Sequence, residues 1–321
     1  MERSREGDGG LIVRGTGIAT FMGLRHTRDL SGVDVAIVGE PSDTGGTTGS
    51  RYAPSAIRDV SSLLRPVHAH HNVTPSDYLN IIDYGDTPVI PTSLQRTYDE
   101  MVGVLAPMHE AGIVPICLGG DHSVTLANLR AAAKTHGPVV MLQFDSHTDT
   151  YDVYHDTERY TSGTMFRRAV EEQIIDAEHS IMIGLRGTVY TNHDYQDARD
   201  LGYQIRTMDD VIESGISRII SDIRETVGDR PLFVTFDVDC LDPAYAPGTG
   251  TLEIGGFTTR EVLGIVRALD GLNYIGFDVV KVNPTLDPTR TTAAVGATMA
   301  FEFLTLLALP HARSRETRGK N

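Results

Sequence analysis

The sequence predicts a three-layer α/β/α fold with a mainly parallel eight-stranded sheet. Short apolar, β-branched segments alternate with longer segments of helical periodicity, which is the pattern that βα units produce. Several of the apolar segments end in polar clusters, as expected where parallel strands place their loops at one edge of a sheet. The chain lacks a long linker or repeat, so we expect one domain over 1–321, with 1–12 and 312–321 frayed.

Eight strands are expected because eight short runs are apolar, rich in Val, Ile, Leu and Phe, and bounded by polar or turn-forming residues. They lie at 33–39, 79–84, 114–118, 139–145, 180–185, 203–207, 231–237 and 274–281. The intervening segments predict helices at 54–64, 93–111, 123–136, 163–174, 194–201, 215–228, 258–269 and 292–309. Thr258, followed by Glu261 three residues later, predicts a capping box at the start of one of these helices.

Composition excludes several classes of partner. The formal net charge of −15 argues against a nucleic-acid backbone or an anionic membrane surface, since both attract basic patches. The N-terminus has no apolar signal core and no run of about 18 apolar residues occurs, so we expect no targeting segment and no membrane span. Cys117 and Cys240 lie in apolar runs, which makes a structural disulfide improbable and a reducing cytoplasm the natural compartment.

Three predicted strands end in clusters of aspartate and histidine. The strand ending at Leu118 continues into GGDHS, the strand ending at Phe144 into DSHTD, and the strand ending at Phe236 into DVDCLDP. Ends of parallel strands meet at one edge of a sheet, so these clusters are expected to share a site. We therefore expect a pair of divalent metal ions to be bound by His122, Asp145, His147, Asp149, Asp237 and Asp239.

The types and the spacing of these residues support a two-metal site. Nitrogen and oxygen ligands together suit Mn²⁺, Ni²⁺ or Zn²⁺ better than Ca²⁺ or Mg²⁺. Six ligands exceed one tetrahedral ion but can hold two ions about 3.5–4 Å apart, which activate one shared hydroxide. A lone aspartate at a strand end is usually a turn former. Alternation by two is harder to explain in that way, because Asp145, His147 and Asp149 would point to one side of an extended strand end.

These segments resemble the three signatures of the ureohydrolase family, which includes arginase, agmatinase and guanidinobutyrase. The matching segments are GGDHS (119–123), DSHTD (145–149) and FDVDCLDPAYAPGTGT (236–251). The resemblance spans nearly the whole chain, and SSLLRPVH (61–68) with DYGD (83–86) looks closest to the branch of guanidine and biguanide (metformin-type) hydrolases. It implies an arginase-like fold, two Mn²⁺ or Ni²⁺ ions, a trimer or hexamer, and hydrolysis of a C–N bond in a guanidine-, amidine- or biguanide-type small molecule.

The resemblance also implies a role for each ligand. Asp145 and Asp237 would bridge the two ions. His122 and Asp149 would complete the ligands of one ion, and His147 and Asp239 those of the other. Asp149 would additionally orient the shared hydroxide, which attacks a planar C=N carbon before an amine leaves.

Two positions depart from the family pattern. Ser162, in TSGTMF, stands where the family has a histidine that shuttles protons or contacts substrate. Lys281, in FDVVKVNP, replaces a glutamate that cradles the guanidinium cation. Two like charges about 4 Å apart repel by roughly 4 kcal/mol at an effective dielectric near 20. Lys281 is therefore rotated outward or solvated, is deprotonated by burial and acts as a base or donor, or belongs to a site for a neutral or anionic group.

Because Ser162 replaces the family's histidine, another group must deliver the proton to the leaving amine. Asp149, water or a neighbouring histidine can serve, and His155 in the tyrosine-rich loop 148–164 is a candidate. The alternative for His155 is an exposed loop histidine.

Three functions follow as hypotheses. The first is a two-metal hydrolase of a guanidine, amidine or biguanide, with a small molecule as its partner. An agmatinase- or guanidinobutyrase-type enzyme is a second possibility. The third is a metal-binding but catalytically weak subunit that supports an active paralogue in a hetero-oligomer, which Ser162 and Lys281 favour and retention of all six ligands opposes.

Overall fold

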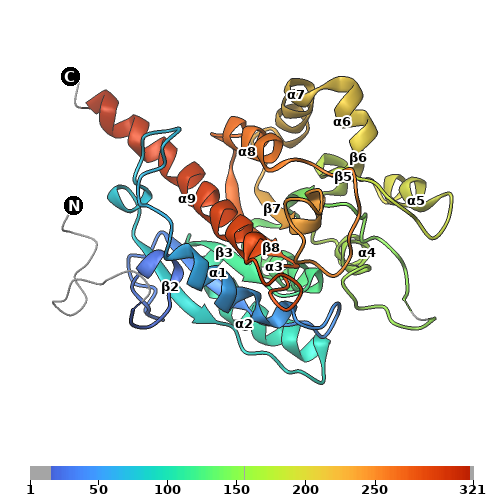
Figure 1. Ribbon diagram of the computed structural model, residues 1–321, viewed down its shortest axis with the longest axis horizontal. Helices are drawn as coiled ribbons and strands as arrows, with labels where there is room; N and C mark the ends of the chain where they lie inside the picture. Colours follow the sequence, from blue (N-terminus) through green and yellow to red (C-terminus); the bar gives the residue numbers. More distant parts are fainter. Residues whose placement is uncertain (1–15, 155, 319–321) are drawn as a thin grey trace.

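The computed structural model describes residues 16–154 and 156–318 (Figure 1). Its centre is one eight-stranded sheet, and every predicted strand is confirmed with small shifts at the ends. The strands are β1 (Val35–Glu40), β2 (Ile81–Asp86), β3 (Val114–Gly119), β4 (Val140–Phe144), β5 (Ile181–Leu185), β6 (Gln204–Thr207), β7 (Leu232–Asp237) and β8 (Tyr274–Val280). The predicted fraying of 1–12 concerns residues outside the described part.

The strand order is β2-β1-β3-β8-β7-β4-β5-β6, and neighbouring strands are parallel throughout. Strands β4, β5 and β6 follow one another toward one edge of the sheet. The next two strands, β7 and β8, lie between β4 and β3. The four central strands thus come from distant parts of the sequence. Their carboxyl ends lie side by side, which is where an open parallel sheet binds ligands.

All eight predicted helices are present, together with one that was not predicted. The helices are α1 (Ala53–Ser61), α2 (Leu94–Glu110), α3 (Thr125–His136), α4 (Met165–Glu171), α5 (Asp194–Asp200), α6 (Met208–Ser214), α7 (Ile216–Val227), α8 (Thr259–Ala268) and α9 (Thr291–Arg318). The capping box of Thr258 and Glu261 is confirmed at α8. The unpredicted helix α6 is short and begins directly after β6, where Thr207 and Asp210 form a second capping box.

Helices cover both faces of the sheet, which confirms the three-layer fold. Alternation along β1 shows the two faces: Val35 and Ile37 belong to one apolar cluster, whereas Ala36 and Val38 belong to another. The first cluster also contains apolar residues of α1, α7, α8 and α9. Residues of α2, α3 and α4 pack with strand residues in the clusters on the opposite face. Figure 1 shows α9, in red, lying alongside α1.

The end of α9 differs from the prediction. The helix was expected to stop at 309 and the chain to fray from 312, but it remains helical to Arg318. Pro310, which favours an earlier end, lies inside the helix. Ala312 is buried in the core and Arg313 pairs with Asp270, so tertiary contacts stabilise the extra turns.

A window of α9 has a mean hydropathy of 1.7 and is long enough to cross a membrane, but 78% of it is buried inside the fold. Burial of this kind is typical of a core helix.

Candidate metal centre

The three predicted clusters meet at the carboxyl ends of the central strands. His122 opens the single turn η4 (His122–Val124), which follows β3, and the segment 145–149 follows β4. Asp237 ends β7, and Asp239 lies in the turn η6 (Val238–Cys240) directly after it. Because β3, β8, β7 and β4 are neighbours in the sheet, their loops bring these side chains together.

One set of side chains surrounds the ring of His122. Its Nδ1 lies 3.0 Å from Asp145 Oδ2 and 3.0 Å from Asp149 Oδ2. Asp237 Oδ2 is 3.2 Å from the same nitrogen. Ligand atoms of His122, Asp145 and Asp149 all lie within 4.8 Å of one another, as a metal ion requires. We call these three residues the first half-site.

A second set shares Asp145 with the first. His147 Nδ1 lies 3.3 Å from Asp145 Oδ1 and 3.4 Å from Asp239 Oδ2. The ligand atoms of Asp145, His147 and Asp239 again lie within 4.8 Å of one another, and we call these residues the second half-site. Asp145 uses one oxygen toward each half-site, which is the arrangement of a bridging carboxylate.

The ligand pairs Asp145–His147 and Asp237–Asp239 lie in turns. The prediction that these residues continue an extended strand end is therefore wrong. Asp145 Oδ1 accepts the backbone N–H of His147 at 2.8 Å, and Asp237 Oδ1 accepts that of Asp239 at 2.9 Å. Each aspartate therefore closes a short turn with Oδ1 and directs Oδ2 toward His122. Asp149 completes its segment with a φ of +52°, a backbone conformation that non-glycine residues adopt rarely.

Three buried ligand atoms of the centre form no hydrogen bond, although charged groups face them. His122 Nδ1, Asp237 Oδ2 and Asp239 Oδ2 are buried and have no partner with hydrogen-bond geometry in the described structure. Burial, together with the charge of Asp239, raises the pKa of Asp237 to about 7. Burial alone would lower the pKa of His122, but the surrounding carboxylates raise it well above its usual value. Divalent cations would compensate these carboxylates, so the residues present suit a metal pair.

Three polar side chains behind the ligands were not predicted. His122 Nε2 lies 2.9 Å from Thr235 Oγ1, and Gln143 Nε2 donates to Asp145 Oδ2 at 2.8 Å. Ser146 Oγ donates to Asp239 Oδ1 at 2.7 Å. Such contacts orient ligand side chains. The sequence does contain a feature that could have indicated Thr235 and Gln143. Each is a polar residue inside an apolar strand, two positions before a ligand aspartate, as in TFD at 235–237 and QFD at 143–145.

Lys281 points into the centre. It follows β8, which lies between β3 and β7, and its Nζ is 3.0 Å from Asp239 Oδ2 and 3.7 Å from Asp237 Oδ2. Only 10% of the side chain is exposed, so the predictions that Lys281 is solvated or rotated outward are wrong. Burial alone would lower the pKa of Lys281, but Asp237 and Asp239 raise it well above its usual value. These two carboxylates therefore favour the charged ammonium form over the neutral amine that burial alone would produce.

The other two predicted catalytic residues are less central. The backbone N–H of Ser162 donates to Gly45 O at 2.7 Å, and its Oγ lies 2.9 Å from where a Cβ on Gly46 would be. The contacts that the structure describes for Ser162 do not reach either half-site. His155 lies outside the described residues, so its role remains a prediction.

Tyrosines of the same loop lie close to the centre. The rings of Tyr151 and Tyr154 pack edge-to-face at 5.4 Å, and Tyr190 adds a third ring 5.8 Å from Tyr154. Burial, followed by the charge of Asp149, raises the pKa of Tyr154. Tyr151 follows Asp149 by two residues in the chain. The cluster offers an apolar wall for the uncharged part of a ligand.

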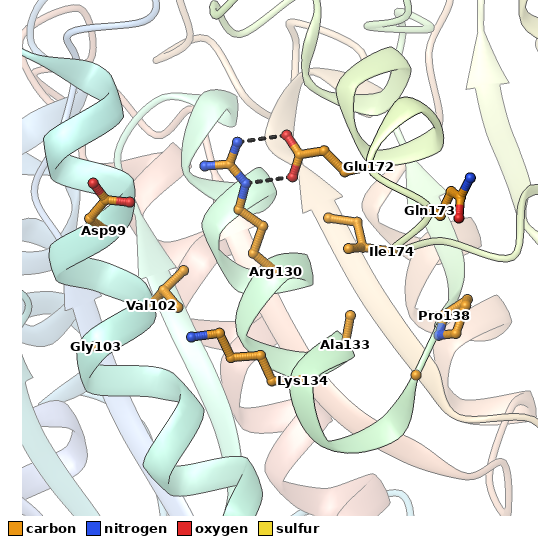
Figure 2. A pocket seen from close by; sticks show the side chains of 11 residues that line it. Asp99, Val102, Gly103, Arg130, Ala133, Lys134, Pro138, Glu172, Gln173 and Ile174 are labelled. Atoms are coloured by element: carbon orange, nitrogen blue, oxygen red, sulfur yellow. Dashed lines mark hydrogen bonds and ion pairs between the residues drawn. The ribbon is translucent and has the colours of Figure 1, made fainter.

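A separate hollow of about 680 Å³ lies over α2 and α3 (Figure 2). Arg130 and Glu172 form two hydrogen bonds beside it, at 2.6 and 2.7 Å. Its lining contains none of the six ligand candidates. The two groups of potential metal ligands lie at the carboxyl ends of the strands instead, so we place the functional site there.

The fold and the site together define a metal-binding hydrolase of the α/β class. The sequence pattern of the arginase family matches residues 33–305. A guanidinopropionase of Pseudomonas aeruginosa is 44% identical over 310 residues, which are 96% of this chain and 97% of that protein. A guanidinobutyrase of the same species is 38% identical over 91% of this chain and 92% of its own length.

A solved structure shows the same architecture. Proclavaminate amidino hydrolase from Streptomyces clavuligerus superposes with a TM-score of 0.87 at 37% identity, covering 92% of this chain and 99% of that one. The chain belongs to the arginase family of ureohydrolases.

Proposed function

We propose that the chain hydrolyses a C–N bond of a guanidino acid with the aid of two divalent metal ions. The observation that carries this proposal is the convergence of two half-sites on the shared carboxylate Asp145, with buried ligand atoms that lack hydrogen bonds. Relatives named guanidinopropionase and guanidinobutyrase support a guanidino substrate.

The ligand assignment follows the two half-sites. His122 and Asp149 would bind one ion, His147 and Asp239 the other, and Asp145 and Asp237 would contact both. The mixed nitrogen and oxygen donors suit Mn²⁺ or Ni²⁺. Bound ions of this kind lower the pKa of water toward neutrality and so supply a nucleophile.

The reaction transfers one water to the guanidinium carbon. The water oxygen forms a bond to that carbon, the bond from the carbon to the substituted nitrogen breaks, and the products are urea and the substituted ammonium ion R–NH3+, in which R is the acid side chain. Both protons of the water reach the leaving nitrogen. Asp149 lies at the centre and retains some exposure, so its carboxylate can take a proton from water and pass it to the departing amine.

Lys281 supports a guanidino acid as the substrate. Its charge beside Asp239 disfavours a substrate with two positive charges, such as agmatine, and tolerates one whose guanidinium is balanced by a carboxylate. A biguanide carries an intermediate charge and is the next class to test. The aromatic cluster of Tyr151, Tyr154 and Tyr190 can line the side-chain end of such a substrate.

The test follows urea release from 3-guanidinopropionate, 4-guanidinobutyrate and agmatine, and release of dimethylamine and guanylurea from a dimethylbiguanide, after reconstitution with Mn²⁺ or Ni²⁺. We expect turnover of the guanidino acids and its loss in Asp145→Asn. Lys281→Glu should shift preference toward agmatine, and an unchanged ratio would remove Lys281 from substrate selection. Absence of turnover on the whole panel, with both ions bound, would contradict the proposed activity of the isolated chain.

A catalytically weak subunit of a hetero-oligomer is the second candidate, because Lys281 occupies part of the second half-site. Co-expression with a paralogue distinguishes the two. Activity that appears only in a mixed trimer or hexamer supports the subunit role, whereas activity of the homo-oligomer excludes it.

A further inference from the structure

Ion pairs tie the tyrosine-rich loop 148–164 to helix α4, which follows it. Asp152 of the loop accepts a hydrogen bond from Arg168 Nη2 of α4 at 2.6 Å. Arg159, also in the loop, forms an ion pair with Glu171 of the same helix at 2.7 Å. Arg168 also pairs with Glu171 at 3.0 Å, and Arg159 with Asp152 at 3.3 Å. We call these four residues the loop clamp.

Arg168 is the fixed member of the loop clamp. Its side chain is 1% exposed, whereas that of Asp152 is 57% exposed. In residues 16–154 and 156–318, its Nε and Nη1 are buried without a hydrogen bond, and Nη2 forms both of its ion pairs. The hydrogen bond from Arg168 is the main cause that lowers the pKa of Asp152 below its usual value. Because a buried charge without a partner is costly, the core arginine holds the loop carboxylate against the helix.

The base of the loop is held separately. The backbone carbonyl of Asp149 accepts the N–H of Phe166 at 3.2 Å, and the backbone N–H of Tyr151 donates to Gly163 O at 3.0 Å. Neither bond involves a member of the loop clamp. Loss of the clamp should therefore free the loop beyond Tyr151 while Asp149 keeps its own anchor.

The clamped part of the loop carries Tyr154. Its ring leaves no room for a side chain at Gly163, where an added Cβ would lie 2.5 Å from it. The pKa of its hydroxyl is raised by burial and then by the charge of Asp149, and the charge of Lys281 lowers it. Tyr154 is therefore close enough to the metal centre for charges of that centre to act on it, so its position depends on the loop and matters at the centre.

We propose that the loop clamp positions the substrate: it holds Tyr154 where the aromatic cluster of Tyr151, Tyr154 and Tyr190 can contact the side-chain end of the guanidino acid. Arg168 and Asp152 are positioning residues, since they act on the substrate through Tyr154. The inference rests on the proposed function for the class of substrate. It assigns the clamp to substrate binding and not to the chemical step, because Asp149 is anchored independently.

The first measurement is amide hydrogen exchange by mass spectrometry on the metal-reconstituted full-length chain without substrate. Asp152→Ala removes the carboxylate that Arg168 binds. We expect the segment 152–163 to exchange about tenfold faster, which corresponds to the lower end of the usual strength of a hydrogen bond to a charged group. Asp59→Ala is the matched control, because Asp59 is exposed to a similar extent and pairs with the distant Arg290. It should leave the exchange of this segment unchanged.

The second measurement is turnover of 3-guanidinopropionate. Asp152→Ala should raise KM about tenfold and leave kcat within about twofold, as expected for a loss of binding that does not affect the chemical step. Asp152→Glu, which retains the carboxylate, should recover most of the lost affinity. Arg159→Met removes the other loop member of the clamp from a half-exposed position, and it should also speed exchange and raise KM.

Faster exchange together with a higher KM supports the inference. Unchanged exchange in both Asp152→Ala and Arg159→Met, or a fall in kcat with an unchanged KM, would overturn it and leave the proposed function intact. If the unaltered chain hydrolyses no guanidino acid, the proposed function fails and the role in substrate binding fails with it, whereas the exchange measurement still decides whether the clamp holds the loop.

Discussion

The contact behind His122 allows a quantitative prediction. For Nδ1 to bind a metal ion, the ring must carry its proton on Nε2, which then donates to Thr235 Oγ1 at 2.9 Å. Thr235→Val preserves the shape of the residue but removes this acceptor. In the metal-free protein the raised pKa keeps a proton on Nδ1, which faces Asp145 and Asp149 at 3.0 Å, so the ring can respond by releasing the proton of Nε2. In the metal-bound protein it cannot, so the cost falls on the bound state.

A buried N–H without an acceptor costs about 1–3 kcal/mol, and loss of such partners typically weakens metal binding by about 10–100-fold. We therefore expect Thr235→Val to raise the dissociation constant for Mn²⁺ bound by His122 by about 10–100-fold, measured by competition with a chromophoric chelator. Thr305→Val is the matched control, because its buried hydroxyl donates to Phe301 O within α9. Equal dissociation constants for the two variants would refute the reasoning.

Three further outcomes are expected. Phe303 is fully buried and stacks on Phe277 at 4.5 Å, so Phe303→Ala should lower the free energy of unfolding in urea by about 3–5 kcal/mol, and a loss below about 1 kcal/mol would contradict this packing. Burial raises the pKa of Glu302, but hydrogen bonds from His68 and Arg267 outweigh it and lower the pKa below 4.5. The stabilisation is then present above the unfolded-state pKa and lost as pH falls through the lower folded-state pKa. The stability difference between the unaltered protein and Glu302→Gln should therefore be larger at pH 7 than in acid, and a pH-independent difference would contradict the ion pairs. Removal of metal by EDTA should abolish urea release, and Mn²⁺ should restore it; activity that survives chelation and dialysis would contradict metal dependence.

Much of the fold could be predicted because most strands are short runs in which apolar residues predominate. Helices cover both faces of the sheet, so strand residues on both faces are buried and the strands can be recognised as apolar segments in the sequence. Helix α6 was missed because seven residues show little periodicity, and only the capping pair Thr207 and Asp210 marks it. The end of α9 was misjudged because Arg313 and Ala312 are stabilised by contacts with distant segments.

The candidate site was predictable in composition but not in detail. Strand-end position indicated which side chains would meet, and the structure brings all six together. The turns closed by Asp145 and Asp237 depend on local hydrogen bonds that residue spacing does not distinguish from an extended chain. The direction of Lys281 depends on β8 lying between β3 and β7, which is a property of the sheet order and not of the local sequence.

The measurement that tests the central claim most directly is the origin of the oxygen in the product. The metal-reconstituted chain is supplied with 3-guanidinopropionate in water enriched in ¹⁸O, and the urea is analysed by mass spectrometry. Hydrolysis at the centre formed by His122, Asp145 and Asp237 predicts urea that carries one ¹⁸O atom, with no product from Asp145→Asn. Urea that lacks the label, or equal turnover by Asp145→Asn, would contradict the account.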